Sequence, residues 1–210
     1  MATTNYPGSL DAYAQPNNGD TISVADHWLG PAVIGIETEL GTDPAGTFTD
    51  VKSRLDSGLV TQADMWRLTA SKTVDGDLAA NLERADTGSP GLLGTGMTES
   101  SGFFSFPETG IYLVTVQAYI FVSAIPDNVI LRTQVTTNNS SYSVQADAVG
   151  HAAGGAGDSN GFSQLLVDVT DVANVKVKFT AGSIGSSGNG IYGNTSYNST
   201  SFSFIRLGGT

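Results

Sequence analysis

The chain has 210 residues, of which 20 are acidic and 9 basic, and its net charge is -11. This charge excludes the basic surface of a nucleic-acid-binding protein, and an anionic membrane would repel it. The absence of cysteine excludes disulfides, thiolate catalysis and Cys-ligated metals. The 26 glycines and the low charged fraction of 14% favour short strands joined by tight turns, so we expect a mainly β protein.

The first 25 residues are rich in Asn, Pro, Gly and Thr and show no hydrophobic period. They predict an extended arm, which is ordered only when it is docked on another surface. The opening residues have neither a basic leader nor an apolar core, so we expect no signal peptide. No apolar run approaches 18 residues, and we therefore expect no membrane insertion.

Two short amphipathic helices are predicted after the arm. The first lies within residues 26–40 and ends at Gly41, with an apolar stripe formed by Leu29, Val33, Ile36 and Leu40. Thr47 is the predicted N-cap of the second helix, and Asp50 favours its N-terminus. The apolar face of this helix consists of Phe48, Val51 and Leu55. Neither helix buries its stripe alone, so the pair must pack on each other, on neighbouring chains or on a host surface.

Strand patterns dominate the remainder of the chain. Eight segments combine apolar runs with flanking Gly, Asn, Ser or Pro, namely Met65–Ala70, Gly102–Phe106, Gly110–Val122, Asn128–Thr136, Tyr142–Val149, Phe162–Val169, Val175–Ala181 and Ser201–Leu207. Within residues 73–97, the segment 78–84 fits either a short helix or a strand. The segments 150–161 and 182–200 are rich in Gly and Ser and predict long loops at the rim of a sandwich or jelly roll.

The segment Gly110–Val122, GIYLVTVQAYIFV, is apolar on both faces of a predicted strand. The even-numbered residues from Tyr112 to Val122 suit a domain core. The odd-numbered face mixes apolar groups with Thr115, Gln117 and Tyr119, and such a mixture is typical of a subunit interface. The pattern therefore predicts an oligomer.

The segment FSFPETGIYLVTVQAYIF, from Phe104 to Phe121, and the closing strand TSFSFIRLG resemble the paired signatures of the tumour necrosis factor and complement-globular-head superfamily. The resemblance implies a ten-stranded, trimeric jelly roll with Tyr112, Val114, Val116, Phe202 and Phe204 in its core. It also implies that the threefold axis is lined by Leu113, Thr115, Gln117, Tyr119, Ile205 and Leu207. The lack of a collagen-like stalk, a transmembrane anchor and cysteine argues against a secreted animal ligand.

The front section resembles a second set of proteins. The phrases NYPGSLDAYAQPNNGDTISVADH and IETELGTDPAGTFTDVKSRLD are similar to a module near the N-termini of bacteriophage virion proteins, chiefly tail fibres and head or neck fibres. The histidine-rich centre of that module is reduced here to His27. The phrase MTESSGFFSFPETGIYLV also resembles the jelly-roll heads of phage and bacterial surface proteins.

The sequence offers little for catalysis or cofactors. His27 and His151 are the only histidines, and no pattern places a carboxylate and a nucleophile beside either of them. A carboxylate pair for glycoside cleavage could be drawn only from Asp147, Asp158, Asp168 and Asp171, which suit strand ends and turns better. Calcium ligation where Asp147, Asp158 and Asn160 converge is an alternative to plain turn-forming roles. We expect no enzymatic activity and no cofactor.

Tyr192 and Tyr197 lie in the second predicted rim loop among Asn and Ser residues. Aromatic rings stack on the apolar faces of sugars, so these residues are candidates for a receptor-binding loop. The alternative is that both rings simply pack over the end of the jelly roll.

Together these patterns predict an N-terminal virion-anchoring module at residues 1–61 and a jelly-roll trimerisation domain at residues 62–210. The expected protein is a homotrimeric virion structural protein on the particle surface, either a capsid decoration or head fibre, or a short tail or neck fibre. Its expected partners are capsid, neck or tail proteins and a host-surface glycan. The alternative function is a receptor- or carbohydrate-binding adhesin module of a tail fibre or bacterial surface protein.

Overall fold

The computed structural model describes residues 33–38, 40–47, 49–57, 59–86, 88, 91–123, 128–152, 155–185 and 188–210. The chain divides into two compact units, Met1–Gly58 and Leu59–Thr210. Within the described residues, no helix is long and apolar enough to span a membrane.

The first unit contains the two predicted helical segments in shorter form. Residues 33–38 and 40 are helical, and the Gly41 N–H donates to the Glu37 carbonyl at 2.8 Å. Gly41 has φ = 76°, a left-handed conformation that glycine adopts without strain, so it ends this helix as predicted. The rest of the predicted helix, with Leu29 and Pro31, lies outside the described residues.

The second helix, α2, spans Val51–Ser57 and is capped by a different residue from the one predicted. Asp50 precedes it, and the Asp50 carboxylate accepts a hydrogen bond from the Ser53 N–H at 2.7 Å. This hydrogen bond lowers the pKa of Asp50. The assignment of Thr47 as the cap was therefore wrong, because Asp50 is the residue that directly precedes the helix and accepts this hydrogen bond.

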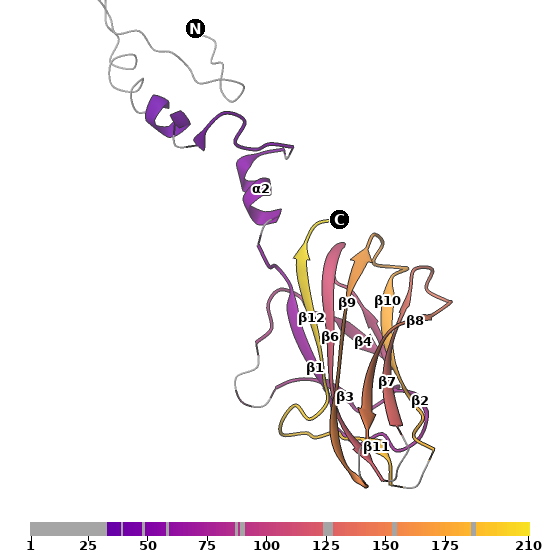
Figure 1. The fold of residues 1–210 in the computed structure, drawn as a ribbon. Helices are drawn as coiled ribbons and strands as arrows, with labels where there is room; N and C mark the ends of the chain where they lie inside the picture. Colours follow the sequence, from indigo (N-terminus) through magenta and orange to yellow (C-terminus); the bar gives the residue numbers. More distant parts are fainter. Residues whose placement is uncertain are drawn as a thin grey trace, which may run out of the picture. The chain divides into compact units, whose positions relative to one another are not determined.

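The second unit is a β-sandwich of two antiparallel sheets (Figure 1). The first sheet has the order β3-β1-β12-β6-β9 and the second has the order β4-β5-β10-β7-β8. These ten strands are β1 (Ala63–Leu68), β3 (Leu82–Arg84), β4 (Thr98–Ser100), β5 (Phe103–Ser105), β6 (Gly110–Val122), β7 (Asn128–Thr136), β8 (Ser143–His151), β9 (Gly157–Val169), β10 (Lys176–Gly182) and β12 (Ser201–Gly208). Two short strands extend the sheets, β2 (Gly76–Asp77) beside β10 and β11 (Gly190–Ile191) beside β6.

One predicted loop contains more strand than its composition indicated. The segment 150–161 was predicted as a rim loop, yet β8 continues to His151 and β9 begins at Gly157. Small residues are tolerated there because β9 pairs with β6 along its whole length, from Gly157 opposite Val122 to Val169 opposite Gly110. The ambiguous segment 78–84 ends in strand β3, which pairs with β1.

The core lies between the two sheets and confirms the even-numbered face of β6. Tyr112, Val114, Val116, Ala118, Ile120 and Val122 are all buried. Phe104 of the second sheet lies among four aromatic rings, those of Trp66, Phe179, Phe202 and Phe204, with ring centroids 5.1 to 6.4 Å away. Burial of these rings is the largest apolar contribution to the sandwich.

A buried carboxylate joins β1 to the segment before β4. Asp64 accepts hydrogen bonds from the Trp66 indole at 2.8 Å and from the Met97 N–H at 2.7 Å. The Arg84 guanidinium pairs with Asp64 at 2.9 Å and lies 5.0 Å from the Trp66 ring centre. Every polar group of this cluster is thus compensated, as a buried charge requires.

Asp77 connects β2 to β10 on the outer face of the second sheet. Its carboxylate accepts from Lys178 at 2.8 Å and from Thr180 at 2.6 Å. Partial burial alone would raise the pKa of Asp77, but these hydrogen bonds and the charges of Lys178 and Lys72 lower it overall. The ionised carboxylate is therefore favoured in the folded state.

We expect Asp77→Asn to reduce the free energy of unfolding at pH 7 by about 1 kcal/mol or less, because solvent screens a carboxylate that is 38% exposed. A lowered folded-state pKa stabilises the fold above the unfolded pKa, and this contribution is lost as the pH falls through the folded pKa. The difference from wild type should therefore shrink below about pH 4. Urea unfolding between pH 3 and 7 measures this difference in the free energy of unfolding. Asp147→Asn, on the same sheet and 3.7 Å from Arg132, is the control, and an Asp77→Asn deficit that persists unchanged at pH 3 would contradict the prediction.

Candidate functional site

The outer face of the first sheet carries a continuous row of apolar side chains across three strands. Leu113 at the centre of β6 lies opposite Leu166 of β9 on one side and Ile205 of β12 on the other. Residues that are directly opposite in antiparallel strands project to the same face. The three side chains therefore form one band across the sheet.

The predicted axial residues all lie on or beside this face. Leu113, Thr115, Tyr119 and Ile205 are half-buried in the isolated chain, and Gln117 and Leu207 are exposed. Leu207 lies within a register shift, since Arg206 pairs with Tyr112 and Gly208 pairs with Ile111. Its direction is thus set by the bulge and not by regular alternation.

Two prominent residues of this face were missing from the sequence prediction. Phe162 lies opposite Gln117 and is 62% exposed, and Leu166 is 63% exposed. The signal was present in FSQLLVDV, because Phe162 and Leu166 fall on one face while Leu165, Val167 and Val169 fall on the other. Only the pairing of β9 with β6 shows that these residues extend the same band.

The band makes this face suited to protein association. Large apolar side chains that are contiguous and exposed mark interaction surfaces in proteins. Polar groups interrupt the band at Thr115 and Gln164, which lie opposite each other, and at Gln117. An apolar surface with a few polar groups matches the composition of subunit interfaces.

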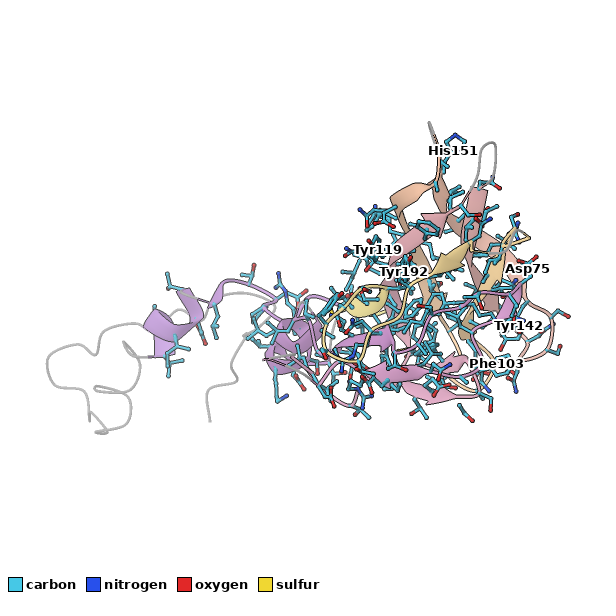
Figure 2. All side chains as sticks on the ribbon, turned by 90° about the horizontal axis from the view of Figure 1, so that it is seen from below. Asp75, Phe103, Tyr119, Tyr142, His151 and Tyr192 are labelled. Atoms are coloured by element: carbon cyan, nitrogen blue, oxygen red, sulfur yellow. The ribbon has the colours of Figure 1, made fainter. Side chains whose placement is uncertain are left out.

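An aromatic cluster lies at one end of the same strand. Tyr119 and Tyr192 lie near each other in Figure 2, and their ring centroids are 4.9 Å apart. Phe121 contacts Tyr192 edge-on at 6.2 Å. The Tyr119 hydroxyl donates to Asp158 at 2.5 Å, and this hydrogen bond raises the pKa of Tyr119. Tyr192 is thus packed on a predicted axial residue.

Tyr197, the second residue of the predicted receptor loop, is 61% exposed. The Asn194 side chain accepts hydrogen bonds from the N–H groups of Ser196 and Tyr197 at 2.7 and 3.2 Å. This local turn orders the loop without covering the tyrosine ring. The two candidate tyrosines therefore have different surroundings, one packed and one open.

The predicted anchor residues belong to the first unit. Leu29 and Phe48 lie outside the described residues. Ile36, Leu40 and Leu55 are exposed, and Val33 and Val51 are half-buried. Short helices gain most of their stability from packing of an apolar face, so these exposed side chains are available to a surface beyond this unit.

The carboxylates considered for metal binding or catalysis have other partners. Asp147 faces Arg132 at 3.7 Å, and Asp158 binds the Tyr119 hydroxyl. In the part of the chain that the structure describes, no group of three or more His, Cys, Asp or Glu side chains could hold a metal ion. His151 is exposed at the end of β8 (Figure 2), and His27 lies outside the described residues. The convergence of Asp147, Asp158 and Asn160 as calcium ligands stays an alternative that no contact of the described residues tests.

No protein-family model and no curated protein matches the sequence. Solved structures do match. A crystal structure of murine APRIL at pH 5.0 has a TM-score of 0.52 and 9% identity, and the match covers 70% of this chain and 98% of that one. The structure of Eiger TNF from S. frugiperda has a TM-score of 0.51 and 13% identity, with 72% and 96% covered.

At such low identity, the structural matches show a likeness of fold. The order of the strands in both sheets and their antiparallel pairing agree with this fold. The resemblance of the front section to phage virion modules stays a prediction, since the matches bear on the sandwich. The second unit of this chain is a jelly roll of the tumour necrosis factor type.

Proposed function

We propose that this chain is a bacteriophage virion structural protein that assembles as a homotrimer through the outer face of its first sheet. The observation that carries the proposal is the apolar band of Leu113, Leu166 and Ile205, extended by Phe162. A monomer would leave this band in water, whereas a trimer would bury it around a threefold axis. Obligate interfaces of this type exceed about 2,000 Å² in total.

The tumour necrosis factor type of fold supports the trimer, and the front section supports the location. Ile36, Leu40 and Leu55 in the first unit are exposed apolar residues, and they suit docking on a particle protein. The phrases of this section that resemble phage virion modules include TELGT and VKSRLD. In this proposal the first unit attaches the trimer to the particle and the jelly roll projects from it, acting by adhesion and stabilisation without catalysis.

Two positions in the particle fit this architecture. A capsid decoration or head fibre suits a single jelly roll joined to one docking unit. A short tail or neck fibre suits the front module, which resembles those of tail fibres. Both positions use the same trimer and the same docking unit, so copy number separates them.

Quantitative mass spectrometry of purified particles from the source of this sequence tests the proposal. We expect the chain to be present in the particles. Hundreds of copies per particle indicate a decoration, and a few trimers indicate a fibre. Absence of the chain from purified particles would contradict the virion function and leave the adhesin alternative.

The second candidate function is a receptor- or carbohydrate-binding adhesin module. The exposed ring of Tyr197 in an ordered, Asn-rich loop favours it. Tyr192 contributes less surface to such a site because its ring packs on Tyr119.

A further inference from the structure

A second surface feature lies on the outer face of the second sheet, on the side of the sandwich away from the apolar band. It is a hollow of about 390 Å³ whose lining includes two aromatic rings, a lysine, hydroxyl groups and an amide. Its lining residues include Ser100, Phe103, Ser105, Asn139, Tyr142 and Lys176. Figure 2 shows Phe103 and Tyr142 beside each other and well separated from Tyr119 and Tyr192.

A paired cation contacts both rings. Phe103 and Tyr142 have ring centroids 5.6 Å apart at an interplanar angle of 47°. The Lys178 ammonium lies 4.9 Å from the Tyr142 ring centre and 5.9 Å from that of Phe103. Because Lys178 is also bound to Asp77 at 2.8 Å, its charge is compensated within the protein. The rings therefore form a preorganised apolar platform.

The sheet register places a polar row beside this platform. Lys178 lies opposite Phe103, which lies opposite Ser100. Two residues further along β5 and two residues back along β10, Ser105 and Lys176 form the next pair. This step corresponds to about 7 Å, which is the scale of one sugar ring with its substituents. The Ser105 hydroxyl and the Lys176 ammonium therefore lie about the length of one sugar ring away from the aromatic rings.

The loop between β7 and β8 contributes to the lining of the hollow and is itself ordered. The Asn138 side chain accepts hydrogen bonds from the N–H groups of Ser140 and Ser141 at 3.1 and 2.9 Å. The Asn139 N–H donates to the Asn174 carbonyl at 2.9 Å. These bonds fix the part of the loop that carries Asn139 and Tyr142 into the hollow. Burial, followed by the charge of Asp77, raises the pKa of Tyr142, so its hydroxyl stays a hydrogen-bond donor at neutral pH.

Lys176 differs from Lys178 in its pairing. Among the described residues, Lys176 has no carboxylate within ion-pair distance, whereas Lys178 has Asp77. The chain carries 20 acidic and 9 basic residues, so an uncompensated lysine in a lined hollow indicates a negatively charged ligand. The overall charge of -11 disfavours polyanions, and a ligand with a single carboxylate fits better.

We propose that this hollow binds an oligosaccharide that carries a carboxylate, as uronic and sialic acids do. The sugar ring stacks on Phe103 and Tyr142, the carboxylate pairs with Lys176, and the Ser and Asn side chains bond the sugar hydroxyls. A pocket with an apolar wall and a few convergent polar groups is the usual form of a small-ligand site. The proposal is independent of the virion function and of the loop with Tyr192 and Tyr197.

Isothermal titration of the full chain tests the site with 3′-sialyllactose and cellobiouronic acid as acidic probes, and lactose and cellobiose as their neutral counterparts. We expect at least one acidic probe to bind, and its neutral counterpart to bind at least about tenfold more weakly, given the strength of a hydrogen bond to a charged group. Lys176→Gln should weaken the affinity for the acidic probe by roughly tenfold to a hundredfold and leave the affinity for the neutral probe unchanged.

Phe103→Ala and Tyr142→Ala should each weaken the affinity for acidic and neutral probes alike. Tyr142→Phe keeps the ring and should therefore retain most of the affinity. Val149→Ala is the control and should bind like wild type, because Val149 is an exposed residue of β8 that does not line the hollow. The proposal is overturned if neither acidic probe binds, if Lys176→Gln binds them as wild type does, or if Tyr197→Ala abolishes binding while the Phe103 and Tyr142 variants do not. Light scattering on the same samples reports the trimer separately, because the hollow lies on the opposite sheet.

Discussion

Leu113→Asp is expected to convert the proposed trimer into monomers. The substitution places a carboxylate at the centre of the apolar band, between Leu166 and Ile205. A buried and unpaired charge costs about 3–5 kcal/mol, and the trimer contains three of them. The dissociation constant should therefore rise by several powers of ten, and size-exclusion chromatography with light scattering at micromolar concentration should show the mass of one chain, close to 21.7 kDa.

The fold should survive this change because Leu113 projects away from the core. Val149→Asp is the matched control, since Val149 is an exposed β-branched residue in β8 of the second sheet. It should remain a trimer. Leu113 is a sharper choice than Tyr119, which is also tied to Tyr192 and Asp158. A Leu113→Asp protein that elutes as a trimer would contradict the proposed interface, and so would a wild-type chain that is monomeric.

Phe104→Ala is expected to produce the largest loss of stability within the jelly roll. Phe104 is fully buried and contacts the rings of Trp66, Phe179, Phe202 and Phe204. Removal of a buried phenyl ring costs about 3–5 kcal/mol, because the transfer free energy is lost and a cavity remains. Urea unfolding followed by tryptophan fluorescence measures the change, with Trp66 as a neighbouring probe. Protein concentration must be constant, since association contributes to apparent stability.

Phe103→Ala is the control for this experiment because it removes the same ring from the adjacent residue of β5. Phe103 is 36% exposed and projects to the other face of the sheet, so its loss should cost about 1 kcal/mol. The comparison separates burial from residue type. Equal losses for the two variants would contradict the assignment of Phe104 to the centre of the core.

The long strand β6 was predictable to the residue. Its apolar run, in which the polar Thr115 and Gln117 both lie on the odd-numbered face, extends from Gly110 to Val122 with turn residues on both sides, and the observed strand has the same bounds. The buried even-numbered face was predictable for the same reason, since side chains alternate between the faces of a strand. Asn128–Thr136 was equally clear. Strong local periodicity determines such elements before any tertiary contact is considered.

Segments without that periodicity were predicted less well. The Gly-rich stretch after His151 looks like a loop in composition, yet Gly157 and Gly161 lie in β9 because β6 offers a partner along its full length. The choice between Thr47 and Asp50 as the cap of α2 depended on which residue directly precedes the helix. Local propensity is a weak determinant where a neighbouring strand or turn supplies the hydrogen bonds.

The sequence alone determined the fold class, the core face of β6 and the presence of a second apolar face. These properties follow from composition and from the alternation of side chains, which are local. Only the tertiary structure decided that Phe162 and Leu166 join Leu113 in one band, that Tyr192 packs on Tyr119, and that Phe103, Tyr142 and Lys176 border one hollow. Each of these groupings joins strands or loops far apart in the chain, and cross-strand register, which no local pattern specifies, sets which side chains meet.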